Sequence, residues 1–401
     1  AFALSAGAHA GLDSAVPAPD AKLDAGPPAV ELVFNERLDA GGAKLLVLDA
    51  GGDRIAGDKP ERTQEGAGIR LKLPKLGEGY YTVSYSVISA DGHPVSGAYV
   101  FTVGDPPPLT DASSLNPHTQ VGHAHHGGGD LTSRAFLLYA SRIVYYAGLL
   151  VAAGIAFWSL ARSVAPLVAR VRDDAAGLAG KFALLATLAY VFVSLTDLGQ
   201  GEPLSDWLRI LTGTTVGKLY IAQLMLALAA PLLNRLAAAA RVVWALAALL
   251  IEAWSGHAAA FEPAFYTIGL NVVHLVAAAV WSGGLLLLLA VWLKERPEAG
   301  RFALLFSKWA LVSFLLLWAT GVLSTLQFLP DLSYLLYTSW GKWLIAKAAI
   351  SLVVAVVALV IRWRLSRGDL PRGGLLKTDV GLLGAIVLTV GVLTYQTPLP
   401  A

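Results

Sequence analysis

The sequence has no cysteine, one methionine and few charged residues. Without cysteine the chain has no disulfide and no thiolate nucleophile or metal site, and a single methionine cannot form a thioether ladder for a soft metal. Charged residues make up 14% of the 401 residues, against about 25% in soluble domains. Apolar residues reach 56%, which argues against a single soluble globule. Because the chain has no cysteine and one methionine, any metal site must use histidine and carboxylate ligands.

Charge and tryptophan are unevenly distributed along the chain. Residues 1–130 carry 9 Lys and Arg against 16 Asp and Glu, whereas residues 131–401 carry 21 against 12 and hold all 11 tryptophans. In the second part the charges gather between long apolar runs, as in membrane-spanning proteins. We therefore predict two parts, an acidic soluble one and a basic one embedded in a membrane.

The first part has the pattern of β-structure. Between residues 9 and 105 the helical period is missing, and short alternating runs are separated by Gly, Pro and Asp. A stretch of about 95 residues with this pattern predicts an all-β, Ig-like antiparallel sandwich. Strands are expected at 30–35, 44–48, 69–73, 80–89 and 98–103, with a turn at 50–53 before a further short strand.

The segments that flank the β-region differ from it in composition. The N-terminus, AFALSAGAHA, is typical of the end of a signal peptide. Cleavage after Ala8 would make His9 the first residue, whereas cleavage after Ala10 would remove it. A stretch with three consecutive prolines, four histidines and three consecutive glycines predicts a tether. The expected divisions are a residual signal segment at 1–8, a β-domain at 9–105, a linker at 106–133 and a membrane domain at 134–401.

Apolar segments long enough to cross a bilayer follow residue 134, and we expect about eight transmembrane helices. The segments lie near 135–161, 179–198, 216–236, 241–258, 266–293, 302–327, 342–363 and 378–396. With the β-domain outside, the cytoplasmic loops carry fourteen Lys and Arg residues and the outer loops three, as the positive-inside rule requires. We predict a multi-pass protein of the cytoplasmic (inner) membrane, with the N-terminal domain and the C-terminus on the extracytoplasmic side.

The eight histidines fall only in parts expected outside the cytoplasm or in the outer half of the membrane. Imidazole is the commonest metal ligand and suits copper, nickel and zinc, so this placement indicates a relay of metal sites. For the linker histidines the alternative is adventitious metal binding, whereas a histidine within a membrane segment is costly and usually functional. The linker holds His118, His123, His125 and His126, and the membrane segments hold His257 and His274.

Asp91 and His93 lie two residues apart in the segment SADGHPVSG. Residues i and i+2 of an extended chain share a face, so the two side chains can bind one ion, although Asp-Gly also marks ordinary turns. With His9 at a free N-terminus, its amine and its ring would add two nitrogen ligands. Nitrogen and oxygen ligands in tetragonal geometry suit Cu(II).

Two stretches of the first part resemble the CopC family of periplasmic copper-binding proteins. They are HAGLDSAVPAPDAKLDAGPPAVELVFNERL and GYYTVSYSVISADGHPVSGAYVFTV. The resemblance implies that His9 with its amine, Asp91 and His93 bind Cu(II). CopC proteins that also hold Cu(I) use a Met-rich loop, which this sequence lacks.

The second part resembles CopD, and the whole chain is similar to CopC-CopD fusion proteins of the YcnJ type, which are implicated in copper uptake or tolerance. The segments that carry the resemblance are SGHA at 255–258, AAAVWSGG at 277–284, FSKWALVSFLLLWATGVLS at 306–324 and WGK at 340–342. It implies Cu(II) as the ligand of the β-domain and Cu(I) as a further species for the membrane domain. Expected partners are copper ions, the lipid bilayer and an extracytoplasmic copper chaperone, with no nucleic acid.

Helical spacing adds a candidate membrane site. Asn271, His274 and Trp281 share a stripe of the fifth segment, because they are spaced at i, i+3 and i+10. We expect His257 and His274 to form a copper site in the outer half of the membrane, with Asn271 and Trp281 shaping its wall. Further polar residues near membrane depth are Arg142, Asp197, Glu252 and Lys347, together with Thr320, whose hydroxyl type more often serves helix packing.

Three functions remain open at this point. The favoured one is capture of Cu(II) outside and translocation of copper through the bundle, with import as the expected direction, in copper homeostasis. The alternatives are copper sequestration or tolerance without transport, and a haem- or copper-dependent membrane redox protein, because paired helix histidines can ligate b-type haem. The sequence has no G-x-x-x-x-G-K-[ST] motif and no nucleophile-base-acid arrangement, so we expect neither an ATP-driven pump nor an enzyme.

Overall fold

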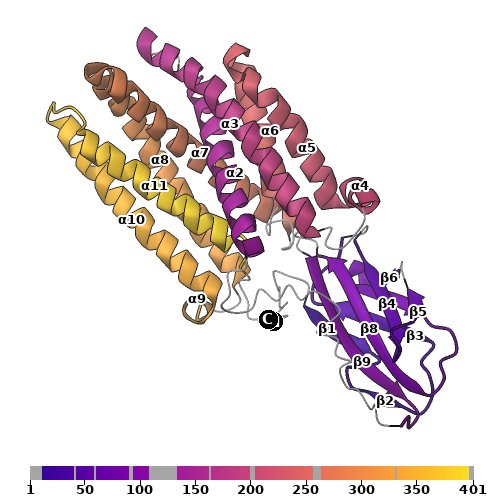
Figure 1. The fold of residues 1–401 in the computed structure, drawn as a ribbon. Coiled ribbons are helices and arrows are strands. Elements are labelled where there is room, and N and C mark those ends of the chain that lie inside the picture. The colour runs from indigo at the N-terminus through magenta and orange to yellow at the C-terminus, as the bar shows by residue number, and fades with distance from the viewer. Residues whose placement is uncertain are drawn as a thin grey trace. The chain divides into compact units, whose positions relative to one another are not determined.

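The computed structural model describes residues 11–39, 42–57, 60–89, 94–107, 133–161, 164–198, 204–255, 263–329 and 332–396. The chain divides into two compact units, one made of residues 1–130, 197–218 and 401, and the other of residues 131–196 and 219–400. The first unit contains the described strands, and the second is a bundle of long helices (Figure 1).

Nine strands build the first unit. They form a four-stranded sheet in the order β1-β3-β7-β6 and a five-stranded sheet in the order β2-β9-β8-β4-β5. All the pairs are antiparallel except β2 with β9. The expected antiparallel sandwich is therefore confirmed. The strands are β1 (Leu12–Val16), β2 (Lys22–Leu23), β3 (Ala29–Phe34), β4 (Lys44–Asp49), β5 (Arg54–Gly57), β6 (Glu61–Thr63), β7 (Gly68–Lys72), β8 (Gly79–Ile88) and β9 (Pro94–Val103).

Side chains of both sheets meet in one apolar core. Val30, Leu32 and Phe34 alternate along β3 and are buried, as the period of two in a strand requires. Leu32 lies in the same cluster as Phe101 of β9, on the other sheet, and both are fully buried. Burying a side chain of this size stabilises the fold by about 1.5–3 kcal/mol. The core therefore joins the two sheets.

Three strands were not expected from the sequence. The five predicted strands correspond to β3, β4, β7, β8 and β9, and the short strand after the turn is β5. The additional strands β1, β2 and β6 all lie at sheet edges. Edge strands have one unpaired side and are often short, so the alternation of buried and exposed residues is weak in them. In β1, for example, no residue is fully buried.

Seven helices of the described residues are long and apolar enough to cross a membrane. Six of them are single α-helices, and the seventh joins α5 to the 3-10 helix η3. After residue 130 the described helices are α2 (Ser133–Trp158), α3 (Pro166–Leu198), α4 (Leu204–Gly213), α5 (Thr215–Ala229), η3 (Ala230–Arg235), α6 (Ala238–Trp254), α7 (Ala264–Lys294), α8 (Arg296–Phe328), α9 (Tyr334–Tyr337), α10 (Ser339–Ser366) and α11 (Gly373–Leu393).

The helices agree with the expectation of about eight membrane segments. The remaining predicted segment, 241–258, corresponds to α6, which has 17 residues. α3 begins at Pro166, well before the predicted start at 179. Its first turns carry several charged residues, and this pattern predicts a loop from the sequence alone. In the structure Asp173 of this stretch pairs with Arg241 of α6 at 2.6 Å, so the charges are compensated within the bundle.

α2 and α7 approach each other closely at two glycines. A Cβ added to Gly283 would lie 2.6 Å from the Cα of Gly154, and a Cβ added to Gly154 would lie 2.8 Å from the Cα of Gly283. Neither position has room for a side chain. Small residues allow helix backbones in a membrane to come this close, where packing rather than the hydrophobic effect drives association.

The glycine contact predicts a position-specific loss of stability. Gly283→Ala should destabilise the bundle by about 1–3 kcal/mol, because the added methyl group forces the two backbones apart. Gly269→Ala, on the same helix, has nothing within 4 Å of the added Cβ and serves as the control. Thermal unfolding of both purified variants in detergent measures the difference. Equal melting temperatures for the two variants would contradict the close contact.

Candidate functional site

Metal-ligating residues do not form an obvious cluster within the described ranges, where no group of three or more His, Asp or Glu side chains is placed to hold a metal ion. Of the predicted site residues, the structure describes Asn271, His274 and Trp281. The others lie outside the described residues: His9, Asp91, His93, His118, His123, His125, His126 and His257. Described residues flank His9, Asp91 and His93, and their contacts are described next.

The β8–β9 hairpin fixes both ends of the segment that carries Asp91 and His93. Ile88 of β8 pairs with Pro94 of β9 as the last residue pair of the hairpin. Ser89, the next residue along β8, is fully buried and forms a bridge with Leu38. The described backbone on both sides of this segment is therefore paired with neighbouring chain.

The start of the described chain is held close to the same place. The N–H of Gly11 donates to Oδ1 of Asn35 at 2.8 Å, and the N–H of Asn35 donates to the carbonyl of Gly11 at 3.0 Å. Three residues after Asn35, Leu38 makes its bridge to Ser89. The short stretch 35–38 thus connects the anchor of the N-terminus to the anchor of the hairpin end.

Two tyrosines of the same hairpin lie at least partly in the core, Tyr99 buried and Tyr85 half-buried. Tyr85 pairs with Gly97, and Tyr99 pairs with Val83. Burial raises the pKa of both phenols, and the neighbouring Tyr85 raises the pKa of Tyr99 further. Both side chains therefore stay protonated near neutral pH. Neither supplies a ready phenolate to compete with imidazole and carboxylate for a metal ion.

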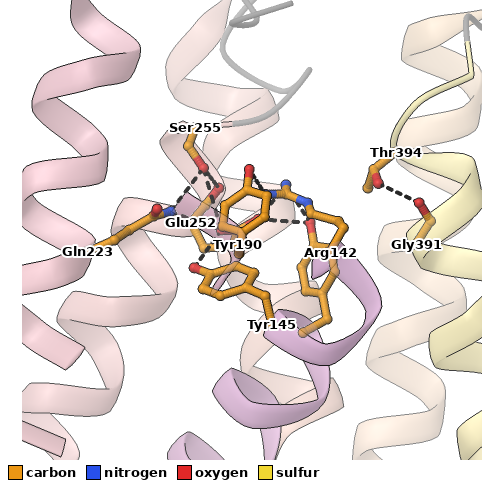
Figure 2. A network of polar contacts seen from close by, with 9 residues as sticks. Arg142, Tyr145, Tyr190, Gln223, Glu252, Ser255, Gly391 and Thr394 are labelled. Carbon is orange, nitrogen blue, oxygen red and sulfur yellow. Dashed lines mark hydrogen bonds and ion pairs between the residues drawn. The ribbon is translucent and has the colours of Figure 1, made fainter. Parts of the chain in front are cut away.

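In the helical unit, a polar network surrounds an ion pair between Arg142 of α2 and Glu252 of α6 (Figure 2). Nη2 of Arg142 lies 2.8 Å from Oε1 of Glu252, and the two residues are 6% and 2% exposed. Tyr146 donates to the same oxygen at 2.8 Å, and Tyr145 donates to Oε2 at 2.8 Å. Gln223 of α5 donates to Oε2 at 3.2 Å. The carboxylate is thus saturated with donors.

Arg142 is enclosed as completely as its partner. Its guanidinium donates to the hydroxyls of Tyr146 and Tyr190. The Cζ atom also lies 4.7 Å from the ring centroids of Tyr146 and Tyr190 and 5.7 Å from that of Tyr145, so the cation faces three aromatic rings. Because Tyr190 comes from α3, the network joins four helices. An ion pair that is fully hydrogen-bonded in this way suits a structural role in a membrane interior.

His274 lies in a second polar group, with one residue from each of two neighbouring helices. Its Nδ1 is 2.8 Å from Oγ1 of Thr320 on α8, and its Nε2 is 3.5 Å from Nζ of Lys347 on α10. The hydroxyl of Thr320 donates to the carbonyl of Leu316 at 2.6 Å, so its oxygen is left to accept a proton from the ring. This arrangement assigns the ring proton to Nδ1 and the lone pair to Nε2.

Asn271 and Trp281 do not contact His274 by hydrogen bonds in the described part of the chain. Asn271 is half-buried, and Trp281 packs against Phe314 with ring centroids 6.0 Å apart. Trp281 belongs to the apolar cluster of the bundle. Their expected role as walls of a copper site therefore stays a prediction.

Sequence reasoning identified some members of both groups but not their pairing. Arg142, Glu252, Lys347 and Thr320 stood out as polar residues at membrane depth. Tyr145, Tyr190 and Gln223 were missed, because their polar partners lie far away along the chain. The spacing of Arg142, Tyr145 and Tyr146 at i, i+3 and i+4 was the available signal, since it places them on one face of a helix.

Comparisons with known proteins match both parts of the chain. The CopC domain matches residues 12–104, and the copper resistance protein D-like, N-terminal domain matches residues 125–266. The chain is 27% identical over 419 residues to the copper transport protein CutJ of Bacillus subtilis (strain 168), which covers 96% of this chain and 74% of that relative. It is 35% identical over 109 residues to copper resistance protein C of Escherichia coli, covering 25% of this chain and 86% of that relative.

A solved structure matches the N-terminal part alone. The crystal structure of CopC from Methylosinus trichosporium OB3b is 30% identical, covers 25% of this chain and 99% of that chain, and has a TM-score of 0.23.

The buried ion pair predicts strong coupling between its two members. Glu252→Gln keeps the shape of the side chain but leaves Arg142 charged without a counterion, and should cost about 3–5 kcal/mol of stability. The double variant Arg142→Met/Glu252→Gln removes both charges and should be more stable than the single variant. Thermal unfolding in detergent measures four proteins: the wild type, Glu252→Gln, Arg142→Met and the double variant.

The pair between the exposed Arg301 and the half-buried Glu298, at 2.7 Å, provides the control. Arg301→Met should change stability by less than about 1 kcal/mol, because solvent screens this pair. A double variant whose loss equals the sum of the two single losses would contradict the coupling of Arg142 with Glu252.

Proposed function

The chain belongs to the family of copper proteins that join an N-terminal CopC domain to a CopD-like membrane domain, and on this premise we propose that it captures Cu(II) outside the cytoplasm and passes copper inward through its helical bundle. Its relatives are named for copper transport and resistance rather than for catalysis, which agrees with the expectation that the chain is not an enzyme. It is a membrane protein with a copper-binding β-domain. The ligands, the transfer and the direction are the proposal.

One observation carries the capture site: the anchors of the two ligand-bearing segments are joined by the stretch 35–38. His9 precedes the anchored Gly11 by two residues, and Asp91 follows the anchored Ser89 by two. A chain covers about 3.4 Å per residue, so a two-residue step limits the backbone of His9 and of Asp91 to a reach of about 7 Å from these anchors. This reach supports a site in which the amine and ring of His9, the carboxylate of Asp91 and the ring of His93 share one Cu(II).

His274 supports a receiving site in the bundle. Its neutral ring is oriented by Thr320. Nε2 carries the lone pair and is the atom that would bind copper. The ammonium of Lys347 now lies beside that lone pair. Because two cations cannot use one lone pair, copper has to displace Lys347 in order to bind. His257, on the chain that follows α6, is proposed as the second ligand.

Direction and transfer complete the proposal. The charge distribution of the loops supports a topology in which the β-domain and the C-terminus lie outside the cytoplasmic (inner) membrane, and in this topology copper reaches the bundle from that side. The linker residues His118, His123, His125 and His126 would carry copper from the β-domain to the bundle, and an extracytoplasmic chaperone would deliver it to the β-domain. Sequestration without transport differs from this proposal in one measurable respect, the absence of inward flux.

The capture site predicts a change in the Cu(II) spectrum when its ligands change. Protein that begins at His9 should give a tetragonal, nitrogen-rich electron paramagnetic resonance spectrum with one Cu(II). An added N-terminal residue should weaken binding and alter the spectrum, because the amine then becomes an amide. His93→Ala should weaken binding further. The control replaces the four linker histidines with Ser and should leave the affinity unchanged; an unchanged spectrum after N-terminal extension would contradict the amine ligand.

The receiving site predicts a loss of copper flux that depends on ring orientation. His274→Ala should reduce uptake of radioactive copper into oriented vesicles and leave Cu(II) capture by the β-domain unchanged. Thr320→Val should also reduce flux, because the ring loses the acceptor that fixes its tautomer. Thr325→Val is the matched control, since Oγ1 of Thr325 donates only to the carbonyl of Gly321 on its own helix, at 2.8 Å. Wild-type flux in both His274→Ala and Thr320→Val would remove His274 from the path, and no inward flux in the wild type would favour sequestration.

A further inference from the structure

Asp379 is a buried carboxyl within the membrane-spanning helix α11. Its exposed fraction is 2%, and its Oδ1 has no hydrogen-bond partner. Across the described ranges of the chain, no hydrogen bond or ion pair to either carboxyl oxygen is found. Asp379 thus differs from Glu252, which is equally buried but accepts donors from several side chains. The proposed capture site and receiving site for copper do not include Asp379.

The surroundings of Asp379 are apolar. Leu376 and Val380, on the same helix, belong to or pack against the large apolar cluster of the bundle. α2, α7 and α10 pack against α11, and they contribute to this cluster Trp158, Leu287, Leu288, Val354 and Ile361.

The charged side chains that the structure describes on these helices are engaged elsewhere or exposed. On α2, Arg142 binds Glu252; on α10, Lys347 contacts His274 and Arg364 pairs with Asp369 at 2.8 Å. The exposed charged residues are Lys294 on α7, Lys342 and Arg362 on α10, and Lys377 on α11 itself. None of these described residues forms an ion pair with Asp379.

We propose that Asp379 is a proton-binding site of the bundle and that its proton is exchanged as copper passes, an inference that rests on the proposed transport function. A carboxylate that is buried among apolar side chains and has no cation beside it is strongly disfavoured, whereas the carboxylic acid carries no charge. An ionisable residue inside a membrane segment is retained when it serves a pathway for ions or protons. Asp379 is an ionisable residue inside a membrane segment, and its burial without a cation favours the protonated, uncharged carboxyl.

The position of Asp379 suits an exchange at the exit of the path. The start of α11 packs against the end of α7, where the indole N–H of Trp292 donates to the carbonyl of Pro371 at 3.0 Å. Asp379 lies six residues beyond Gly373, about 9 Å along α11. His274 lies ten residues from the opposite end of α7. The two residues therefore lie toward opposite ends of the bundle.

The exchange balances in charge. When the proton of Asp379 leaves to water, the carboxylate keeps one negative charge, which compensates one positive charge of the copper ion as it passes. When copper has left, the carboxylate takes up a proton from water and becomes neutral again. One proton is thus released and one bound for each copper ion that passes.

Infrared difference spectroscopy of the full-length protein in lipid nanodiscs tests the proton site without transport. The wild type at neutral pH should show the C=O stretch of a protonated carboxyl, and Asp379→Asn should lose it. Thr389→Val, a control on the same helix, should retain it, because Oγ1 of Thr389 donates only to a backbone carbonyl of α11. If Asp379→Asn fails to fold, Asp379→Glu takes its place and should shift the band. A wild type without the band, or a variant with an unchanged band, would overturn the proton site.

Copper uptake into proteoliposomes that contain a pH-sensitive dye tests the exchange. The wild type should move protons together with copper and should respond to an imposed pH gradient. Asp379→Asn should lose that response, and Thr389→Val should keep it. Copper flux that is independent of the gradient in the wild type would overturn the exchange. An absence of copper flux in the wild type would overturn the proposed transport and the exchange together, while the infrared band would still decide whether Asp379 holds a proton.

Discussion

The ion pair between Arg142 and Glu252 is the interaction on which the arrangement of the helical unit depends. In an apolar interior neither charge can be solvated, so each must find its partner and enough further hydrogen bonds before burial is tolerable. Tyr145, Tyr146, Tyr190 and Gln223 supply those bonds from three helices, while Glu252 comes from a fourth. Helices α2, α3, α5 and α6 are thereby held in one register, since a shift of α2 or α6 by a single turn would leave a buried charge unpaired and a shift of α3 or α5 would remove a hydrogen bond to the pair.

Three polar places in the bundle differ in how completely they are satisfied. Glu252 accepts hydrogen bonds on both oxygens and leaves no room for a ligand. His274 is satisfied on Nδ1 and only weakly engaged on Nε2, where Lys347 lies at 3.5 Å. Asp379 has no partner among the described residues. The first place suits a fixed scaffold, and the other two suit ligands that come and go, because exchange requires a group whose bonding is incomplete.

The sequence predicted the parts of the fold that depend on local periodicity. Alternation identified β3 and β8, and long apolar runs identified the membrane helices, because both signals come from burial on a regular element. It missed β1, since an edge strand buries little, and it started α3 too late, since the compensation of Asp173 by Arg241 is a contact between residues 68 positions apart. Arg142 and Glu252 are 110 positions apart, so no local sequence pattern predicts that they pair. Polar type alone marked these residues, and only the packing of the helices shows which of them meet.

The length of α6 has a consequence for the lipid around it. Its 17 residues rise about 25 Å, whereas the hydrocarbon core of a bilayer is about 30 Å thick. A span that is too short is accommodated by local thinning of the bilayer, by flanking side chains that reach to the interface, or by association with further protein. Because Glu252 lies two residues from the end of α6, the mismatch falls next to a saturated polar network rather than a bare helix end. Membrane thickness should therefore act on this part of the bundle more than on the long helices α3 and α8, and a thicker, sterol-rich bilayer would strain it first.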